Sequence, residues 1–158
     1  MTISHPVERQ APIGCRLLSA AGPSLAEHHR RFGTLPRQAG PDLIYAVRDA
    51  GLTGRGGAGF PTSRKLAAVA GRRPVVVGNG AEGEPLSGKD AVLLSVAPHL
   101  VLDGLDAVAD AVGADRVYLY APASAIPAVR YALDERCGQR YDVRVVEAPD
   151  TFVAGEES

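Results

Sequence analysis

Hydrophobic positions along the chain follow two spacings, and together they predict a series of helices and strands. Apolar residues that recur three and four positions apart indicate helices with one buried face, whereas short β-branched runs between turn residues indicate buried strands. The predicted helices cover residues 24–31, 40–50, 61–70, 98–112 and 124–136, and the predicted strands cover 75–77, 117–120 and 143–146.

The order of the later elements is strand, helix, strand, helix, strand, which predicts an α/β fold with a parallel sheet and right-handed crossovers. Residues 1–23 contain three prolines and no clear hydrophobic period, so we expect an irregular N-terminal arm there. The last residues form a loop of glycine and acidic residues with no helix after it. We therefore expect a domain that is cut short at its C-terminal end, with a solvated tail as the alternative.

Several predicted helices carry recognisable start signals. Ser24 with Glu27 three residues later matches a capping box. Pro41 suits the first turn of the next helix, because its missing N–H would have no partner there. Ser124 is expected to cap the helix that runs to about residue 136.

Composition and charge exclude several function classes. The chain has 158 residues, 46% of them hydrophobic and 22% charged, as in an ordinary globular domain. A formal net charge of −1 and the absence of Trp give no support for nucleic-acid binding. No apolar run has transmembrane length, and the N-terminus lacks a signal-peptide core. We therefore expect a cytoplasmic protein with no direct insertion into a membrane.

Cysteines and histidines predict no metal site. Cys15 and Cys137 are too few for an iron–sulfur cluster, which normally takes four thiolates. We expect both to be small buried residues of a protein from a reducing compartment. The histidines show no metal-ligand spacing, and His28 and His29 are expected to be solvated on a short polar helix.

Residues 54–62 form the most informative stretch, because glycines surround Arg55 and lead into a helix that carries Lys65. A backbone that turns sharply and exposes N–H groups beside positive charge suits a phosphate or pyrophosphate. A second glycine-rich polar loop, residues 78–85, follows the predicted strand 75–77. The two loops flank one helix and one strand, which predicts a nucleotide cradle.

Two other interpretations of the first loop remain open. Gly54, Gly56 and Gly59 match the G-x-G-x-x-G dinucleotide fingerprint, which needs a strand before it. If residues 43–47 formed that strand, Glu82 would lie where an acidic residue binds ribose, and the chain would be a simple NAD-binding Rossmann domain. The other interpretation is a flexible turn between two helices that binds no ligand.

Three motifs in order resemble those of the flavin subunit of respiratory complex I. This is the F subunit of bacterial NADH-quinone oxidoreductase, and it is related to NAD-dependent diaphorase subunits of hydrogenases and formate dehydrogenases. The first motif, residues 51–62, is similar to the family's G-L-R-G-R-G-G-A-G-F-P-T. The second, residues 79–85 followed by Lys89-Asp90, resembles N-A-D-E-G-E-P followed by K-D-R. Residues 153–158 resemble a third motif, Y-x-x-G-E-E-S/T.

The resemblance implies that residues 24–158 form a Rossmann-like three-layer domain that binds FMN, with NADH docked over the flavin. The implied activity is that of an NADH dehydrogenase, in which the flavin accepts a hydride from NADH. Electrons would pass to an iron–sulfur, quinone or ferredoxin acceptor, so an electron-acceptor protein is the expected partner. The iron–sulfur cluster itself would not lie in this chain, and the setting would be the cytoplasmic face of a membrane complex.

Motif positions also imply cofactor-binding residues, whereas no side chain is assigned as catalytic because the flavin carries the hydride chemistry. The glycine-loop backbone and Lys65 would hold the phosphate and ribityl chain of FMN. Asn79 and Glu82 would contact the flavin, Phe60 and Glu84 would face NADH, and the last motif would complete the pocket. The full set is Gly54, Arg55, Gly56, Gly57, Phe60, Lys65, Asn79, Glu82, Glu84, Gly155, Glu156 and Glu157.

The sequence also departs from the family pattern. Ala81 stands where the family usually has Asp, and Leu66 with the alanines after it replaces an aromatic cluster that would help to stack the nucleotide. The chain ends where the family continues with the rest of the FMN pocket and further domains. The alternative that follows is an incomplete, non-catalytic fragment of the family, which would need a partner chain to hold flavin.

Overall fold

A three-stranded parallel sheet in the order β1-β2-β3 is the centre of the protein. The computed structural model describes residues 16–36, 40–54, 58–69, 73–82, 87–138 and 140–149. The strands are β1 (Val75–Asn79), β2 (Arg116–Pro122) and β3 (Val143–Ala148). Each strand extends beyond the residues predicted for it, and the predicted parallel α/β fold is confirmed.

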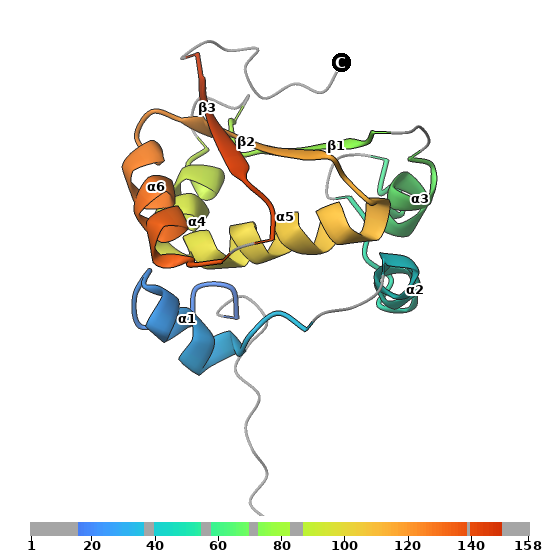
Figure 1. Ribbon diagram of the computed structural model, residues 1–158, viewed down its shortest axis with the longest axis horizontal. Helices are drawn as coiled ribbons and strands as arrows, with labels where there is room; N and C mark the ends of the chain where they lie inside the picture. Colours follow the sequence, from blue (N-terminus) through green and yellow to red (C-terminus); the bar gives the residue numbers. More distant parts are fainter. Residues whose placement is uncertain are drawn as a thin grey trace, which may run out of the picture.

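The helices of the described residues all lie on one side of this sheet. They are α1 (Leu25–Phe32), α2 (Gly40–Asp49), α3 (Thr62–Ala67), α4 (Lys89–Val96), α5 (Pro98–Val112) and α6 (Ile126–Glu135). Figure 1 shows α5 lying under the sheet with α4 and α6 beside it, and α1 and α2 on the far side of α5. The layers are therefore the sheet, the α4–α6 layer and the α1–α2 layer.

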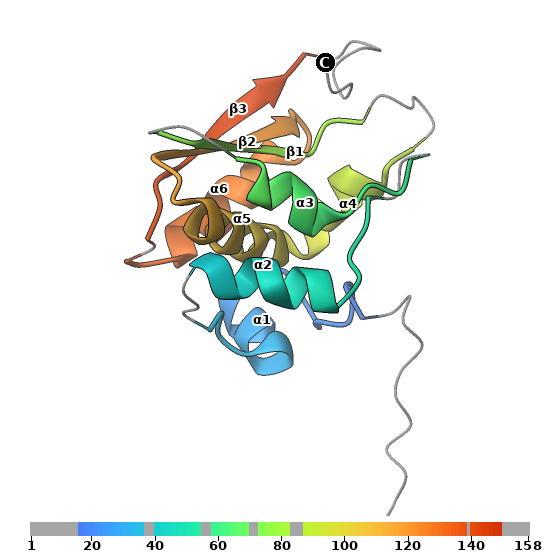
Figure 2. The same cartoon turned by 90° about the vertical axis from the view of Figure 1, so that its right-hand side faces the viewer.

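Both crossovers place their helices on the same face of the sheet, as Figure 2 shows from the side. No described element covers the opposite face, where Val75, Val77 and Val146 remain exposed. Parallel sheets normally have both faces covered. The second helical layer of this fold instead lies behind the first.

Alternating side chains of β2 and one face of α5 build the core. Val117, Leu119 and Ala121 point to the inner face of β2 and are buried, whereas the residues between them are only partly covered. From α5, Leu102 and Leu105 pack into the same cluster. The residues of α5 match the predicted range 98–112, and the helix ends because Gly113 adopts a left-handed conformation.

Helix α2 excludes the simple NAD-binding Rossmann domain. That alternative needed a strand at residues 43–47, but Gly40–Asp49 is helical. The helix packs against α5 and α3, and its apolar residues at three and four spacings, Leu43, Ile44 and Val47, are partly covered there. Asp42 in its first turn and Arg48 in its last turn suit the helix dipole.

Among the other predicted helix boundaries, one cap is confirmed and two boundaries differ from the prediction. Ser24 does cap α1, because its Oγ accepts a hydrogen bond from the Glu27 N–H, while the Glu27 carboxylate pairs with Arg30. Ser124 does not cap α6, which begins two residues later, where a proline in the first turn reduces the number of N–H groups that need a partner. Helix α3 ends at Ala67 rather than at residue 70.

Two expectations about single residues were wrong. His28 is only 3% exposed, because α1 turns this residue toward α5, where its ring is hydrogen bonded to Asp103. Cys137 is exposed, because it follows the end of α6 in the connection to β3. Cys15 and most of the predicted N-terminal arm lie outside the described residues.

No single helix in the described ranges is long and apolar enough to cross a membrane. Helices α4 and α5 meet that test only as a pair, and the chain bends by 96° between them. Within the same ranges, no group of three or more His, Cys, Asp or Glu residues could hold a metal ion.

Candidate functional site

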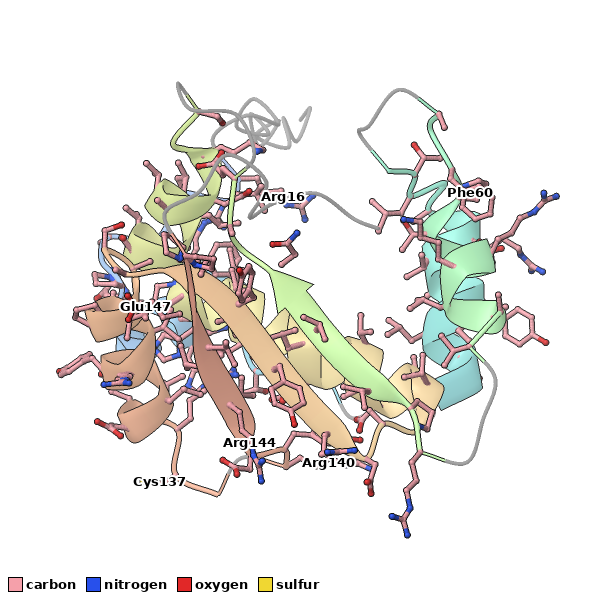
Figure 3. The ribbon with its side chains drawn as sticks, turned by 90° about the horizontal axis from the view of Figure 1, so that it is seen from above. Arg16, Phe60, Cys137, Arg140, Arg144 and Glu147 are labelled. Atoms are coloured by element: carbon pink, nitrogen blue, oxygen red, sulfur yellow. The ribbon has the colours of Figure 1, made fainter. Side chains whose placement is uncertain are left out.

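The predicted site residues that the structure describes lie at one end of the sheet. Open α/β sheets bind their ligands outside the carboxyl ends of the strands. In Figure 3, β1 and β2 run toward the end of the molecule at which Phe60 lies. We call this region, formed by residues 54–62 and by the residues that follow β1, the carboxyl edge.

The first glycine-rich loop is closed at its base by backbone hydrogen bonds. The N–H of Gly54 donates to the carbonyl oxygen of Phe60 at 2.9 Å, and Thr62 donates to Leu52 at 3.0 Å. Thr53 and Pro61 form an antiparallel bridge between these bonds. Gly59 has φ +54°, a left-handed conformation that glycine adopts without strain. The loop is therefore not a flexible turn at its base, where its two ends are held together.

Phe60 lies at the end of the loop, and Lys65 lies on α3, which follows it. The Phe60 ring is 46% exposed, and the Lys65 side chain is also exposed. Helix α3 begins at Thr62 with Pro61 as its N-cap residue, so the side chains of Phe60 and Lys65 lie within one short segment. A lysine ammonium and an exposed aromatic ring are suited to a phosphate and a planar group, respectively.

Asn79 occupies the last position of β1 and fixes how the chain leaves the sheet. Its Oδ1 accepts a hydrogen bond from the Ala81 N–H at 3.2 Å, while the Gly80 N–H donates to Tyr120 at 2.7 Å. Ala81 is buried in the core, which explains an apolar residue where the resembling family has Asp. Asn79 therefore stands on a rigid support at the carboxyl edge.

The glycines beside Asn79 serve packing in the described structure. A Cβ atom on Gly78 would come within 2.8 Å of Leu105 Cδ2, and one on Gly80 within 2.8 Å of Leu94 Cδ1. The same Cβ on Gly80 would lie 3.1 Å from the carbonyl oxygen of Tyr120. These glycines let α5 and α4 approach β1 closely, a role that the sequence alone did not distinguish from a ligand cradle.

Glu82 is held as an anion by its neighbours. Its Oε1 accepts hydrogen bonds from Ser87 Oγ and from Lys89 Nζ, the latter at 2.9 Å. Burial by itself would raise the pKa of Glu82, but the bonds from Ser87 and Lys89, the Lys89 charge and the Asp90 N–H together hold that pKa below its ordinary value. The hydrogen bond to Glu82 in turn raises the pKa of Lys89.

Only part of the predicted site can be placed. Five predicted residues are described: Gly54 and Phe60 in the first loop, Lys65 on α3, Asn79 at the end of β1 and Glu82 after it. The predicted residues that lie outside the described ranges are Arg55, Gly56, Gly57, Glu84, Gly155, Glu156 and Glu157. Sequence reasoning missed Ser87 as a partner of Glu82, because it used Lys89-Asp90 only as part of a family motif and predicted no helix there.

Two larger cavities in the described structure lie elsewhere. One, of about 420 Å³, opens between α2 and α3 and is lined by Ile44, Tyr45, Arg48, Ser63, Arg64 and Ala67. The other, of about 370 Å³, lies between α1, α5 and the residues that follow α6. Neither cavity is lined by a predicted site residue, so we base the candidate site on the chemistry of the carboxyl edge.

The 370 Å³ cavity is lined by four carboxylates and two arginines, and several of these groups are paired with one another or with residues beside the cavity. Asp103 pairs with His28 and Arg136, and Asp110 pairs with Arg140 and with the hydroxyl of Tyr141. Burial and the hydrogen bond to Asp110 raise the pKa of Tyr141, and burial raises the pKa of Asp106 in the same wall. This arrangement joins α1 to α5 and to the connection after α6.

Comparison with known proteins identifies the family. The sequence model of the protein family described as the Nuo51 FMN-binding domain matches residues 47–158 of this chain. The NADH-quinone oxidoreductase F 2 subunit of Rhizobium meliloti is 37% identical over 92 residues, covering 56% of this chain and 22% of the relative. The F 1 subunit of the same organism is 31% identical over 134 residues, covering 73% of this chain and 31% of the relative. The F subunit of Streptomyces coelicolor is 36% identical over 92 residues, covering 56% of this chain and 20% of that protein.

Solved structures agree with the sequence relatives. The chain matches a crystal structure of an NAD+-reducing NiFe hydrogenase in the air-oxidized state with a TM-score of 0.73 and 32% identity, covering 99% of this chain and 28% of that one. The chain thus spans less than a third of the length of these relatives. Because the family model matches well over half of the residues, the chain belongs to the Nuo51 FMN-binding domain family.

Proposed function

We propose that this chain binds FMN at the carboxyl edge and takes part in the oxidation of NADH. The observation that carries the proposal is the closed loop from Gly54 to Phe60, which leads into a helix bearing Lys65 at the ligand-binding end of a parallel sheet. In a chain of this family, these groups are the natural candidates for holding the phosphate and ribityl chain of the flavin.

The groups at the carboxyl edge fit such a ligand chemically. Lys65 supplies positive charge for a phosphate, and the backbone of the glycine loop supplies N–H donors. Asn79 and Glu82 supply an amide and an ionised carboxylate, which suit the N–H and O–H groups of a flavin and a ribose. Phe60 supplies an exposed ring for a flat partner. Arg55, Gly56, Gly57, Glu84, Gly155, Glu156 and Glu157 are proposed to complete the pocket.

When bound, FMN supplies the redox chemistry, because it accepts a hydride from NADH and can release electrons one at a time. The residues of this chain supply position and charge. Lys65 would hold the phosphate end, Asn79 would orient the ring from the end of β1, and Phe60 with Glu84 would face NADH. Glu82 is held ionised, so it can accept a hydrogen bond from a ligand but has no proton to donate.

The electrons need an acceptor on another polypeptide. We propose an iron–sulfur subunit, a ferredoxin-like protein or a quinone-reducing assembly, at the cytoplasmic face of a membrane complex. The support is that curated relatives are subunits of NADH-quinone oxidoreductase and that a solved neighbour is an NAD+-reducing hydrogenase.

An FMN titration of the purified chain tests the proposal. We expect saturable quenching of flavin fluorescence and bleaching of the visible absorbance when NADH is added. Gly56→Glu should abolish binding through steric and charge conflict with the phosphate, and Lys65→Met should weaken it by about tenfold because one charge-assisted contact is lost. The neighbouring Arg64→Met removes a charge from the same helix and is the matched control.

The alternative of an incomplete, non-catalytic fragment predicts a different result. It is supported by the short match to the relatives and by the exposed valines on the outer face of the sheet. A chain that shows no flavin binding at high micromolar FMN would favour this alternative. Binding without bleaching would show a flavin pocket whose nicotinamide half is incomplete.

A further inference from the structure

The Glu82 side chain is largely covered by its neighbours, although it is charged. This side chain is 9% exposed, whereas that of Lys89 is 69% exposed. A buried carboxylate is costly unless hydrogen-bond donors replace the water that it has lost. Ser87 and Lys89 supply two such donors to a single oxygen of Glu82. The charged form of Glu82 is therefore stabilised by Ser87 and Lys89.

Glu82 also serves the beginning of α4. The first N–H groups of a helix need acceptors, but Gly88 is the N-cap residue and makes no side-chain cap. At this helix start the side chain of Lys89, the first residue of α4, donates from Nζ to the Glu82 carboxylate. A negative charge at this end of a helix is favourable. One carboxylate thus connects the exit of β1, the hydroxyl of Ser87 and the first turn of α4.

We propose that Ser87 and Lys89 are positioning residues for the flavin site, because they fix the Glu82 anion in the segment that follows β1. This inference rests on the proposed function. The residues act through Glu82 and need no contact with the ligand themselves. With one oxygen occupied by two donors, Glu82 presents its remaining acceptor capacity in a single orientation toward the N–H or O–H groups of a flavin.

An ordinary surface ion pair would not have this effect. Exposed lysine–carboxylate pairs contribute little, because water and salt screen them. In this cluster the carboxylate is shielded, and it is bound by the hydroxyl of Ser87 as well as by the ammonium group of Lys89. We therefore expect Ser87→Ala and Lys89→Met to have similar effects, whereas a simple charge effect would appear in Lys89→Met alone.

Amide hydrogen exchange of the full chain without flavin tests the connection itself. Ser87→Ala and Lys89→Met should each accelerate exchange at the amides of residues 87–92 by about 3- to 10-fold, with β2 and α6 unchanged. Lys89→Arg should restore the protection, because it keeps a charged donor. Arg130→Met, which removes an exposed charge from α6, is the matched control and should change nothing.

FMN affinity between pH 5 and 8 then tests the positioning role. In the wild type, protonation of Glu82 should not change the FMN affinity in this range. Both variants should bind FMN about 3- to 10-fold more weakly than the wild type, and their affinity should fall further toward pH 5. Unchanged exchange would overturn the connection between Glu82 and α4. Faster exchange with wild-type FMN affinity would overturn the positioning role. If the wild-type chain bound no FMN, the proposed function would fail, and with it the positioning role, while the exchange result would still decide the connection.

Discussion

His28 on α1 and Asp103 on α5 are joined by a hydrogen bond of 2.8 Å between Nε2 and Oδ2, although 75 residues separate them in the sequence. The His28 ring also packs against Phe32, with 5.3 Å between ring centroids. Because the same aspartate pairs with Arg136, this contact links the N-terminal helix to both α5 and the end of α6.

Replacing His28 should therefore destabilise the whole protein. We expect His28→Ala to lower the free energy of unfolding by about 2 kcal/mol, since it removes a buried hydrogen bond and leaves a gap beside Phe32. Urea denaturation followed by circular dichroism measures this. His29→Ala on the same helix is the matched control and should change stability by less than about 0.5 kcal/mol, because that residue is not buried. Equal effects of the two variants would contradict the role of the buried contact.

His99 should make stability depend on pH. Its side chain is 1% exposed, and burial lowers its pKa, with Arg136 and the neighbouring His28 acting in the same direction and Glu135 opposing them. Its Nε2 lies 3.1 Å from Glu135, and its Nδ1 has no hydrogen-bond partner among the described residues.

The sign follows from proton binding. Below the ordinary histidine pKa of 6.5, the unfolded chain binds a proton at His99 more readily than the folded chain does. The stability that neutral His99 contributes is thus present above pH 6.5 and lost on acidification. We expect the free energy of unfolding to decrease between pH 7.5 and 5.5, with a smaller decrease in His99→Gln. Identical pH profiles for wild type and variant would show that another group is responsible; the exposed His29→Gln provides the control.

Gly80 tests whether packing explains a glycine that resembles a ligand loop. Gly80→Ala places a methyl group against Leu94 and the Tyr120 carbonyl, so we expect a loss of about 1–3 kcal/mol of stability in thermal or urea unfolding. Gly104→Ala is the control, because a Cβ atom added at this position inside α5 would meet no atom within 4 Å. That variant should stabilise the protein by about 0.5–1 kcal/mol. Similar effects of the two substitutions would rule out the packing explanation.

The sequence predicted those elements whose burial follows one clear period. Helix α5 has apolar residues on one face and polar residues on the other, and its observed range matches the predicted one. Helix α4 was missed, because Ala91, Val92, Leu93 and Leu94 surround its axis and leave no single apolar face. Local pattern therefore identified amphipathic helices but not a helix with apolar residues on several sides.

Contacts between distant residues could not be predicted in the same way. Nothing near His28 in the sequence indicates Asp103, because their meeting depends on how α1 lies across α5. The structure places Asn79 at the end of β1 and Glu82 three residues later, at the strand end where open parallel sheets bind ligands, whereas their contact with a flavin stays a prediction. The bonds of Glu82 to Ser87 and Lys89 required the path of the chain after β1, which motif spacing does not contain.

Phe60 offers a test that separates ligand binding from folding. Its ring is half exposed beside the closed glycine loop, whose base is held by backbone bonds rather than by the side chain. Phe60→Ala should therefore change the free energy of unfolding by less than about 1 kcal/mol.

If the ring stacks on the nicotinamide nucleotide, the same variant should leave FMN affinity nearly unchanged. It should weaken NADH binding to the FMN-loaded protein by about 5- to 10-fold, since one aromatic contact is lost. The dependence of the bleaching rate on NADH concentration measures this. Leu52→Ala, another exposed apolar residue at the base of the same loop, is the control. A loss of FMN affinity in Phe60→Ala that equals the loss of NADH affinity would instead place the ring against the flavin.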